Sequence, residues 1–479
     1  MELLDLYHTC AEEKRQGKKI VLCHGVFDVV HAGHIQHLKE AKSCGDILVV
    51  TLTPDEFVRK GPSRPVFNQQ TRASVVEAIR YVDLVAVNES PDAMDVLEAI
   101  RPDVYCKGEE VLDCPSNHII KEKEFVEGYG GRVALLRMIG DFSSSKVINQ
   151  TSLGPDLERL IAKVKNLVSY RDIENYFTEL RDLKVLVVGE YIRDEYVLCR
   201  ALNRSSKDVM VPMQHLSEDT YAGGAAVVAR NLAQFCENVS LVTCGDNLAL
   251  QGITTHLCSH PTIRKRRLIE KGTSSKVAEE IHLDEDYPET IRRDLENSVG
   301  ALLGSVDAVI VCDYGHGLFT KDLIGYIIGE SPFLAVNVQT NSANYGYNLV
   351  TKWYDVDYAV IDEKELRLAC GDKKGAIGDL AANLDVANIL AVTLGHEGSV
   401  TYQGGGFVEY FPPVASSVVD TVGAGDAFLS ITAPLVALGL PLTVVGLLGN
   451  AYGAMKVSIF GNKPVDPIEF KKFIKGLLA

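Results

Sequence analysis

In the first 150 residues, short and nearly continuous apolar runs alternate with segments whose apolar residues recur every three or four positions. The runs are typical of buried strands, and the recurring segments are typical of helices that bury one face. The pattern predicts strands at 18–25, 46–53, 83–88 and 102–108, and helices at 35–45, 71–82 and 92–101. This alternation indicates a parallel sheet with crossover helices, in which ligands bind beyond the carboxyl ends of the strands.

From Gly154 to Leu183 the strand pattern gives way to helical periodicity. Pro155 suits the first position of a helix, and apolar residues then follow at helical spacing in two groups. The first group is Leu157, Leu160, Ile161, Val164, Leu167 and Val168, and the second is Ile173, Tyr176, Phe177 and Leu180. We therefore expect an amphipathic helical connector at 151–183 between a first domain at 1–150 and a second domain at 184–479.

The second domain repeats the α/β pattern. Buried strands are predicted at 184–191, 307–315, 333–338, 357–362 and 389–395. Two segments between the first two of these strands, 195–216 and 263–284, combine β-branched apolar residues with exposed polar ones, as β-ribbons do. The expected fold class is α/β throughout, with a small β lid on the second domain.

Composition and charge narrow the possible functions. The 479-residue chain is too long for one ordinary core, and its 46% hydrophobic and 23% charged residues are typical of a globular protein. A net charge of −16 without a long Lys/Arg block argues against nucleic acid as a partner. Eleven cysteines without a C-x-x-C pair argue against zinc ribbons and disulfide frameworks, and favour free thiols in the cytoplasm.

One segment invites a membrane interpretation. Phe428 to Met455 contains no charged residue and is long enough to span a bilayer. Pro434 and Pro441 would break a single helix, however, so two buried helices of an α/β core are the favoured interpretation. The N-terminus has charges on both sides of a short apolar run, so we expect neither a signal peptide nor a membrane partner.

A third of the 12 histidines lie in the short stretch HGVFDVVHAGHIQHL. His31 and His34 open a predicted helix, where backbone N–H groups and the helix dipole favour an anion. Two imidazoles spaced in this way can also donate hydrogen bonds to phosphate oxygens during phosphoryl or nucleotidyl transfer. A metal site would need a third ligand besides Asp28, and purely structural histidines are the other alternative. His37 is expected on the helix surface, and His24 either lines the pocket or lies in the core.

The segment GVFDVVHAGHIQHLKEAKSCGD resembles the H-x-G-H signature of the cytidylyltransferase-like nucleotidyltransferases. The resemblance continues through KGPSRPV, TR, RPDVYCKGEE and DFSSSKVI, and is greatest to the adenylyltransferase half of the bifunctional ADP-heptose synthesis enzymes. It implies a Rossmann-like domain in which His31 and His34 contact the triphosphate and stabilise the transition state. It also implies nucleotide or phosphate contacts from Gly25, Phe27, Asp28, Lys42, Arg72, Lys107, Ser143, Ser144 and Ser145. The alternative for Lys42 is a solvated lysine on the helix.

Near the end of the chain, DTVGAGDAF places small residues before a predicted helix. Gly423, Ala424 and Gly425 leave backbone N–H groups accessible, and the start of such a helix can hold the oxygens of a transferring phosphoryl group. The Asp426 carboxylate beside this turn can accept the proton of an attacking hydroxyl. These residues predict a phosphoryl-transfer site with Asp426 as the catalytic base.

TVGAGDAF also resembles the signature of the ribokinase-like (PfkB) carbohydrate kinases, and the similarity runs from about Lys184 to the end. VGEYIRDEY is similar to their first strand, YAGGAAVVARNLA to their paired-glycine sugar motif, and VTLGHEGS to the strand and turn beside the nucleotide. The resemblance implies substrate contacts from Asp194, Gly223, Gly224, Lys265 and Arg267, and nucleotide-side roles for Thr393, Gly395 and Glu365. Lys265 and Arg267 have an alternative as part of a solvated β-ribbon.

The second half departs from the heptose kinases at several positions. Val227 stands where they carry asparagine, His316 replaces a lysine, Asn337-Val338-Gln339 replaces Asp-Pro-Lys, and Asp362 replaces an asparagine. A hydroxyl that the asparagine recognises would have no partner at Val227. We expect these changes to affect the sugar and phosphate pockets without touching Asp426 or its glycines.

The two resemblances together imply a bifunctional sugar kinase and sugar-1-phosphate nucleotidyltransferase that makes a heptose-like nucleotide sugar for surface polysaccharide or glycoconjugate synthesis. The order of the two domains is the reverse of that in the ADP-heptose enzymes. The implied cofactors are Mg²⁺, ATP for the kinase, and ATP or CTP for nucleotidyl transfer. We expect small-molecule substrates, no separate protein metal site, and a homodimer as the favoured oligomer.

Two alternatives stay open at this point. One is an alcohol-phosphate cytidylyltransferase fused to a kinase with a different substrate. The other is a kinase-like domain that has lost catalysis and senses a ligand. The intact Asp426 and its glycines argue against the second alternative, whereas Val227 and the missing Asp-Pro-Lys argue for it.

Overall fold

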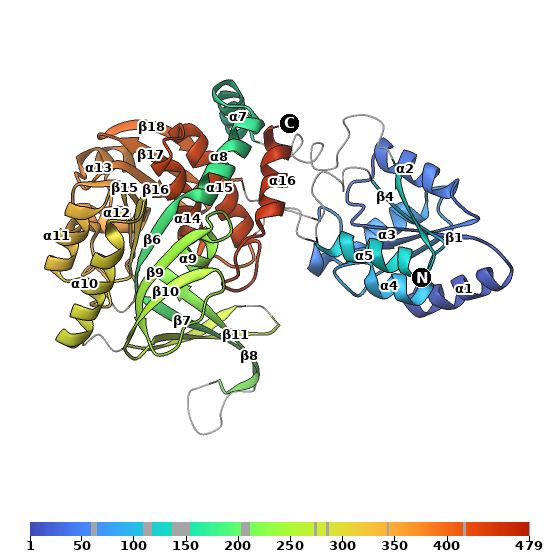
Figure 1. Ribbon diagram of the computed structural model, residues 1–479, viewed down its shortest axis with the longest axis horizontal. Helices are drawn as coiled ribbons and strands as arrows, with labels where there is room; N and C mark the ends of the chain where they lie inside the picture. The colour runs from blue at the N-terminus through green and yellow to red at the C-terminus, as the bar shows by residue number, and fades with distance from the viewer. Residues whose placement is uncertain are drawn as a thin grey trace. The chain divides into compact units, whose positions relative to one another are not determined.

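The computed structural model describes residues 1–58, 65–108, 117–136, 154–202, 211–272, 275–283, 287–342, 344–414 and 418–478. The chain forms two compact units, one made chiefly of residues 1–153 and the other chiefly of residues 154–470 (Figure 1). The described parts of both units are α/β, as the hydrophobic pattern predicts.

The first unit is built on a five-stranded parallel sheet with the order β3-β2-β1-β4-β5. Its strands are β1 (Ile20–Gly25), β2 (Ile47–Leu52), β3 (Leu84–Val87), β4 (Val104–Gly108) and β5 (Arg132–Leu136). Its helices are α1 (Leu3–Arg15), α2 (Ala32–Lys42), α3 (Gln69–Glu77), α4 (Met94–Ile100) and α5 (Asn117–Gly128), with a 3₁₀ turn η1 (Asp55–Phe57). The predicted strands and helices are confirmed, while α1, α5 and β5 are additional.

Alternate residues of β1 belong to two different cores. Ile20 and Leu22 pack in one hydrophobic cluster, and Val21 and Cys23 pack in another. Both faces of the sheet are therefore covered, which explains why its strands are apolar throughout. The strand order reverses between β1 and β4, and their carboxyl ends define the crevice where open α/β sheets bind ligands.

The predicted connector consists of two helices, α7 (Pro155–Leu167) and α8 (Tyr170–Asp182). Both helices bury one apolar stripe, and Ser169 begins α8 with a capping box. Phe177 of α8 stacks on Phe235 at 5.6 Å between ring centroids and meets Phe470 edge-on at 6.0 Å. The connector helices are thus part of the second compact unit.

The main sheet of the second unit has nine strands in the order β10-β9-β6-β13-β14-β15-β16-β17-β18. The strands from β10 to β16 are parallel, and β17 and β18 continue the sheet in antiparallel fashion. They are β6 (Lys184–Gly189), β9 (Asn238–Gly245), β10 (Ile253–Ser259), β13 (Ala308–Asp313), β14 (Leu334–Val338), β15 (Val356–Asp362), β16 (Ala387–Thr393), β17 (Ser399–Gln403) and β18 (Gly406–Phe411). The periodicity did not reveal β9, β10, β17 and β18.

Helices cover both faces of this sheet. One layer contains α10 (Glu289–Leu303), α11 (Lys321–Glu330), α12 (Glu363–Cys370) and α13 (Ile377–Asn383), and the other contains α9 (Ala225–Leu232), α14 (Ala424–Ala437) and α15 (Leu442–Val457) (Figure 1). Helix α16 (Pro467–Leu478) ends the chain, and short 3₁₀ turns lie at η3 (Val350–Lys352) and η4 (Gly395–Glu397).

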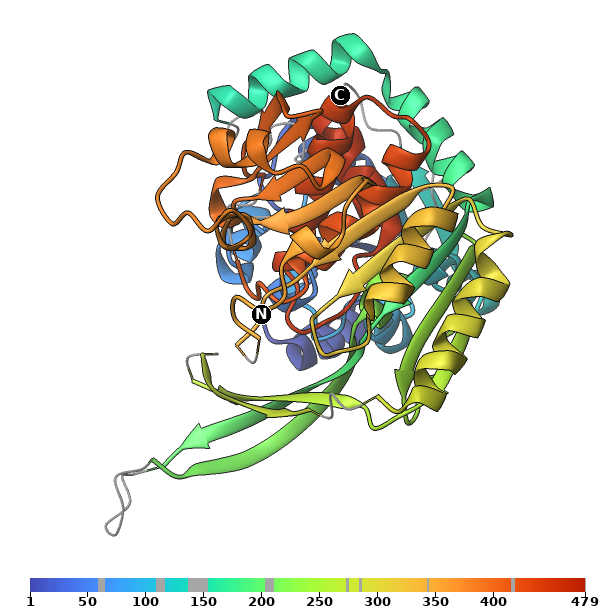
Figure 2. The same cartoon turned by 90° about the vertical axis from the view of Figure 1, so that its left-hand side faces the viewer.

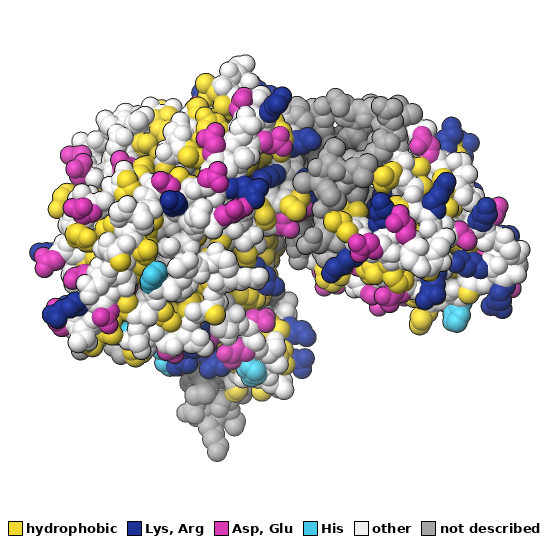
Figure 3. All heavy atoms as spheres, viewed as in Figure 1, with side chains coloured by type: hydrophobic (Ala, Val, Ile, Leu, Met, Phe, Trp, Pro, Cys, Tyr) yellow, Lys and Arg dark blue, Asp and Glu magenta, His cyan; other side chains and the backbone are white. Residues whose placement is uncertain are grey.

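The charge-free segment 428–455 forms parts of two buried helices, α14 and α15, as expected. Pro441 is the N-cap of α15, but Pro434 lies inside α14, so the expectation that it ends a helix was wrong. Within the described residues, no helix combines the length and the apolar character of a membrane span. On the face drawn in Figure 3, basic and acidic side chains are interspersed.

The small β lid is a separate four-stranded sheet in the order β12-β11-β7-β8 (Figure 2). Its strands are β7 (Tyr191–Ala201), β8 (Met213–Gly224), β11 (Ile263–Glu270) and β12 (Lys276–His282). Asp194 of β7 is in register with Lys265 of β11 and with Tyr221 of β8, so these side chains share one face. The other face of β7 carries Tyr191 and Arg193.

Candidate functional site

The predicted histidine pair begins helix α2 and caps it. His31 is the N-cap residue, and its Nδ1 accepts a hydrogen bond from the Gly33 N–H at 3.1 Å. The His31 N–H in turn donates to Nδ1 of His34 at 3.3 Å, which completes a capping box made of two imidazoles. Because both Nδ1 atoms accept hydrogen bonds, the proton of each neutral ring lies on Nε2, and Nε2–H is a donor.

Two buried charged residues build the loops around this helix start. Both Asp28 oxygens accept the Val66 N–H, at 3.0 and 3.1 Å, and Oδ1 also accepts the Phe67 N–H at 3.2 Å. Arg72 donates to the carbonyl oxygens of Val26, Thr53 and Phe67 and to the Asp55 carboxylate. Arg72 therefore fixes the ends of β1 and β2 and the residues before α3.

The backbone after β1 is strained. Phe27 and Val29 both have φ of 48°, a left-handed conformation that is rare outside glycine. A Cβ on Gly25 would lie 3.3 Å from the Phe27 ring, so Gly25 allows that ring to fold back against β1. The Phe27 ring also lies 5.7 Å from the His34 ring, between centroids. Strain of this kind is common where a loop is shaped for a ligand.

Other predicted residues of the first unit lie at different places. Lys107 ends β4 beside β1, and its ammonium lies 3.3 Å from the buried Glu122 carboxylate. Lys42 is at the opposite end of α2 from the histidines, and it contacts the Asp83 carboxylate at 2.5 Å. The structure therefore does not bring Lys42 close to the start of α2, where His31 and His34 lie. Ser143, Ser144, Ser145 and most of the KGPSRPV motif lie outside the described residues.

The other two histidines of the cluster contact side chains of the neighbouring strands. His24 contacts the hydroxyls of Thr51 and Thr53 with its two ring nitrogens, at 3.0 and 3.2 Å. Burial lowers the pKa of His24 to about 3, and the nearby Lys107 adds to this effect. His37 was expected on the surface, but it is buried, with Nε2 at 3.7 Å from the Cys23 sulfur. The helix that carries it packs closely against β1, which explains the difference.

The glycine turn of the second unit begins helix α14 as predicted. Gly423 is its N-cap with φ of 78°, a conformation that favours glycine. The first N–H groups of a helix have no acceptor inside the helix, and here they follow Gly423. A Cβ on Gly425 would meet no atom within 4 Å, so the space beside these groups is open. The turn offers an anion-binding helix start with room for a phosphoryl group.

Asp426 lies in the first turn of α14 and is buried. Its Oδ1 accepts hydrogen bonds from the Tyr314 hydroxyl at 2.9 Å and from Gln339 Nε2 at 2.7 Å. Both hydrogen bonds that its carboxylate accepts within the described chain are on Oδ1, which leaves Oδ2 to face another donor. Burial raises the pKa of Asp426 to about 6, and the two hydrogen bonds oppose that rise.

Lys456 and Asn462 complete the wall behind the glycine turn. Lys456 is fully buried, and its ammonium donates to the Gly461 carbonyl at 2.9 Å. Burial lowers the pKa of Lys456, while Asp420 and Asp426 favour its charged form. A Cβ on Gly423 would lie 2.7 Å from Asn462 Oδ1 and 3.3 Å from Lys456 Cε, so only glycine fits there.

The predicted sugar-binding residues converge on the active face of the lid. Asp194 accepts a hydrogen bond from Arg267 Nη1 at 2.5 Å and one from Asn462 Nδ2 at 3.2 Å. A Cβ on Gly223 would lie 2.1 Å from Asp194 Oδ2, and one on Gly224, whose φ is 61°, would lie 2.2 Å from a backbone oxygen. Gly223 thus makes room for Asp194, and Gly224 allows the close approach of the Glu190 carbonyl.

The two lid cations differ in their surroundings. Arg267 is neutralised by Asp194 and by Glu279, whose carboxylate lies 3.0 Å from Arg267 Nε. Lys265 is buried, and its ammonium makes no ion pair or hydrogen bond with any described residue. Burial lowers the pKa of Lys265, and Asp194 opposes this effect. Lys265 is therefore the lid cation that is available to an anion.

One of the residues that depart from the heptose-kinase pattern contacts the Asp426 carboxylate, contrary to expectation. Gln339 Nε2 contacts both Asp426 Oδ1 and Asn337 Oδ1, the latter at 2.8 Å. Val227 and His316 are fully buried. The altered triplet at the end of β14 therefore holds Asp426 directly, because β14 lies beside β13 in the sheet.

Two buried carboxylates, those of Glu190 and Asp313, lie next to the backbone of Tyr314 and fix its position. Glu190, which follows β6, accepts the N–H groups of Tyr314 and His316 at 3.0 and 3.1 Å. Burial and the neighbouring Asp313 raise the pKa of Glu190 to about 7. Asp313 accepts hydrogen bonds from Trp353 Nε1 at 2.8 Å and from Lys352 at 2.6 Å. These residues position Tyr314 and, through it, Asp426.

The nucleotide-side residues lie at the carboxyl ends of β15 and β16. Thr393 is the register partner of Asp362, and Gly395 follows with φ of 60°. Asp362 caps α12, and the Glu365 oxygens accept the N–H groups of Asp362 at 2.8 Å and Thr340 at 2.9 Å. Burial and the Asp362 carboxylate raise the pKa of Glu365 to about 8.

Several residues of this centre were missed at the sequence level: Glu190, Tyr314, Lys456 and Asn462. For two of them, the sequence contains a feature that could have indicated a functional role. Glu190 directly follows a buried apolar strand, and Lys456 is the first charged residue after the long charge-free segment. Charged residues in such places need partners, and partners of a buried charge are often functional.

Comparisons with known proteins match different families to the two compact units. Residues 22–150 match the cytidylyltransferase-like family, and residues 347–467 match the pfkB family of carbohydrate kinases. The Bifunctional protein HldE of Syntrophotalea carbinolica is 35% identical over 140 residues, and that of Methylobacillus flagellatus is 40% identical over 139 residues. Each match covers 29% of this chain and 28% of the relative, so the chain spans well under half of the length of these relatives.

Solved structures resemble the second unit. Phosphofructokinase-2 from Escherichia coli, in its tetrameric inhibited form and in complex with substrates and products, matches with a TM-score of 0.50 at 13% and 14% identity. Each match covers 62% of this chain and 100% of that structure. The likeness shows a shared fold. Residues 22–150 thus resemble the cytidylyltransferase-like family, and residues 347–467, later in the chain, resemble the pfkB family of carbohydrate kinases.

Proposed function

We propose that the protein is a bifunctional transferase that phosphorylates a sugar or sugar phosphate with ATP and joins the resulting sugar 1-phosphate to a nucleotide from ATP or CTP. The observation that carries this proposal is the presence, in one chain, of two helix starts whose different caps both suit the binding of phosphate. One is capped by two imidazoles, and the other combines a glycine turn with a buried carboxylate. A kinase that makes a sugar 1-phosphate and a transferase that consumes it catalyse consecutive steps.

In the transferase step, a phosphate oxygen of the sugar 1-phosphate attacks the α-phosphorus of the nucleotide, and pyrophosphate leaves. The protein needs donors for the charge that builds on the phosphate oxygens, not a nucleophile of its own. The Nε2–H groups of His31 and His34 are such donors, and the capping box holds their rings in place. Arg72 and Asp28 keep the surrounding loops in position.

In the kinase step, a sugar hydroxyl attacks the γ-phosphorus of ATP, ADP leaves, and the hydroxyl proton passes to Asp426. The carboxylate presents Oδ2 for this purpose, because Tyr314 and Gln339 occupy Oδ1. The N–H groups at the start of α14 hold the transferring phosphoryl oxygens. Asp194, fixed by Arg267 and Asn462, accepts a hydroxyl of the sugar.

Mg²⁺ fits the carboxylate pair on the nucleotide side of the kinase. Burial of Glu365 beside Asp362 raises its pKa to about 8, and a divalent cation would relieve that environment. Magnesium in such enzymes is held by one or two carboxylates together with substrate phosphates. Glu365 and Asp362 would hold it through its waters, and the ion would neutralise the phosphate charge. Within the described residues, no group of three or more potential ligands forms a separate metal site.

The sugar is proposed to carry a phosphate of its own, as in a heptose-like route. Lys265 supports this proposal, because a buried ammonium without a partner is costly unless an anion binds to it. A phosphate on the sugar, distant from the reacting hydroxyl, would supply that anion. If the sugar has such a distal phosphate, a separate phosphatase must act between the two steps.

The test is an assay of the purified protein with ATP or CTP and a panel of hexoses, heptoses and their phosphates. We expect ADP from a sugar or sugar phosphate, and pyrophosphate from a sugar 1-phosphate with one of the two nucleotides. Pyrophosphate release with a non-sugar alcohol phosphate alone would favour the cytidylyltransferase alternative. Nucleotide or sugar binding without any phosphorylation would favour the ligand-sensing alternative.

Replacing Lys456 by methionine should move the acid limb of the kinase pH profile to higher pH. The wild-type rate should fall as the pH drops through about 6, where Asp426 becomes protonated. The Lys456 ammonium lowers the pKa of Asp426 and opposes both burial and the charge of Asp194. Without this ammonium the pKa rises further. The measurement is kcat/KM for sugar phosphorylation as a function of pH.

Lys276→Met is the matched control, because Lys276 pairs with Asp420 at 2.6 Å and is partly exposed. It should leave the acid limb where it is in the wild type. An unshifted limb in Lys456→Met, or an equal shift in both variants, would contradict the role assigned to Lys456.

A further inference from the structure

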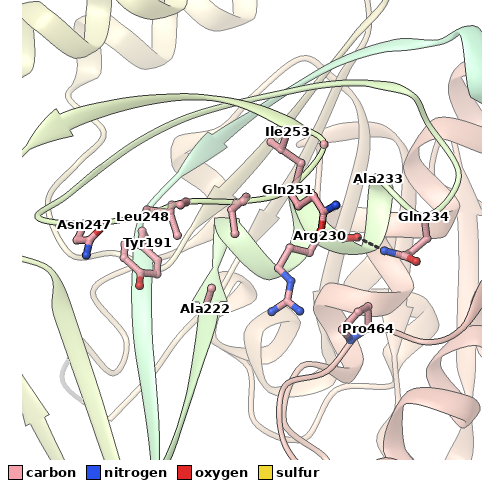
Figure 4. A pocket seen from close by; sticks show the side chains of 13 residues that line it. Tyr191, Ala222, Arg230, Ala233, Gln234, Asn247, Leu248, Gln251, Ile253 and Pro464 are labelled. Carbon is pink, nitrogen blue, oxygen red and sulfur yellow. Dashed lines mark hydrogen bonds between the residues drawn. The ribbon is translucent and has the colours of Figure 1, made fainter.

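A hollow of about 730 Å³ lies on the second unit, behind the base of the lid (Figure 4). Its walls come from α9, from residues 247–252 between β9 and β10, from the start of β7, and from Pro464. Ala222 lines the hollow, whereas the adjacent Gly223 faces Asp194. Because successive residues of a strand point to opposite faces, the hollow lies on the face of the lid away from the kinase centre.

The hollow exists because the connection between β9 and β10 is short. The two strands are parallel, with Ile253 in register with Val239, so the chain must return along the full length of β9. Such a return normally takes about a dozen residues or more and usually contains a helix. Residues 246–252 are too few for a helix that would cover α9 and the sheet edge. The edge of the sheet beside α9 is therefore left open.

The hollow contains one cation without a counter-charge. Arg230 extends from α9 into the space between Ala222 and Pro464 (Figure 4). Its guanidinium makes no ion pair or hydrogen bond with any residue in the described parts of the chain. Arg193 of β7 and Asp246, which follows β9, pair with each other at 3.0 Å. An unmatched guanidinium is unusual in a protein with a net charge of −16.

Neutral hydrogen-bonding groups surround Arg230. The carboxamides of Gln234, Asn247 and Gln251 and the Tyr191 ring line the same hollow, and none of the lining residues is acidic. Carboxamides donate and accept hydrogen bonds, as sugar hydroxyls do, while a guanidinium matches the geometry of a phosphate. The volume is within the range of small-molecule sites.

We propose that this hollow is a second binding site for a hydroxyl-rich phosphate ester, with the phosphate on Arg230 and the hydroxyls on the carboxamides. The ester is a phosphorylated sugar, either free or linked to a nucleotide. The site is separate from the one that holds the substrate of the kinase, and its occupant is not turned over. It does not depend on the activity of either half of the chain.

The test is hydrogen–deuterium exchange of the full chain, followed on the peptide that covers residues 246–252. Saturating glucose 1-phosphate should slow exchange in this peptide by about threefold or more. Glucose and inorganic phosphate, each alone, should have a smaller effect. UDP-glucose tests the nucleotide-linked form, and greater slowing by this compound than by glucose 1-phosphate would identify that form as the preferred ligand.

Arg230→Gln should weaken the binding of glucose 1-phosphate at this peptide by about tenfold or more, because a charge-assisted hydrogen bond is lost. Ala249→Phe, an exposed rim residue, should block the hollow without entering the core. Arg293→Gln is the matched control, since Arg293 is exposed on α10 and pairs with Glu289 in its own helix. It should bind as the wild type does.

Three results would overturn the proposal: no slowing in the wild type, equal slowing in Arg230→Gln, or equal slowing by glucose. Equal slowing by inorganic phosphate would refute the role of the carboxamides. Since the readout is local exchange and not turnover, these outcomes are independent of whether the protein phosphorylates a sugar.

Discussion

Replacing Asp426 by asparagine should reduce sugar phosphorylation by about 10²-fold or more, while the protein keeps its fold and binds nucleotide. The asparagine Oδ1 can still accept the hydrogen bonds of Tyr314 and Gln339. Its amide nitrogen replaces Oδ2, the atom that takes the proton of the attacking hydroxyl, and an amide cannot accept that proton. The burial that raises the pKa of Asp426 to about 6 also means that a neutral side chain is tolerated there.

The measurement is kcat for ADP formation, together with the melting temperature and the affinity for a non-hydrolysable ATP analogue. The other half of the chain supplies an internal control, because pyrophosphate release from a sugar 1-phosphate should not change. Turnover within a few-fold of the wild type would show that Asp426 is not the base. A wild-type protein that phosphorylates none of the sugars in the panel would instead support a sensing role for the second unit.

Replacing His31 by serine should reduce pyrophosphate release by about 10²-fold or more, the effect of removing one donor to a transition-state oxygen. Serine is a good N-cap residue, so the start of α2 should survive the change. The variant separates the two contributions of this ring, because it keeps an oxygen for the Gly33 N–H but lacks the Nε2–H donor. His34→Ala should show a similar loss of activity together with a weaker helix start.

Sugar phosphorylation by the same preparations should match the wild type, and the melting temperature of His31→Ser should change little. Nucleotidyl transfer within a few-fold of the wild type in both variants would refute the role of His31 and His34 as donors to the phosphate oxygens. A lost activity that added Zn²⁺ restores would point to a metal site at these histidines.

Periodicity alone is enough to predict most of the strands that form the two sheets. Strands with both faces covered, such as the one that carries Ile20, Val21 and Leu22, must be apolar throughout. This argument does not apply to the strands at the edges of the sheet. β10 and β18 include exposed and half-buried residues, so their sequences do not stand out from the surrounding loops.

Local motifs predict the two helix starts, because each proposed phosphate site is encoded within a few consecutive residues. The support of these sites is not local. Tyr314 and Gln339 reach Asp426 from the ends of β13 and β14. These strands are neighbours in the sheet, and the order of the strands in a sheet cannot be predicted from hydrophobic periodicity. Lys42 shows the converse, since nearness in sequence to His34 does not make it a neighbour in space when a whole helix lies between them.

The short return between β9 and β10 also bears on how the second unit folds. Closing a loop costs more entropy as the loop grows, and contacts between distant segments form slowly. Val239 and Ile253 are close in sequence, whereas β6 reaches β9 only across the intervening β7 and β8, and β13, which pairs with β6, is synthesised after the whole lid. We therefore expect β9 and β10 to pair first among the parallel strands and to serve as the nucleus onto which β6 and then β13 assemble. The kinase half of a growing chain would then hold an ordered sheet edge long before Asp194 meets Asn462, and hence long before it could bind a sugar.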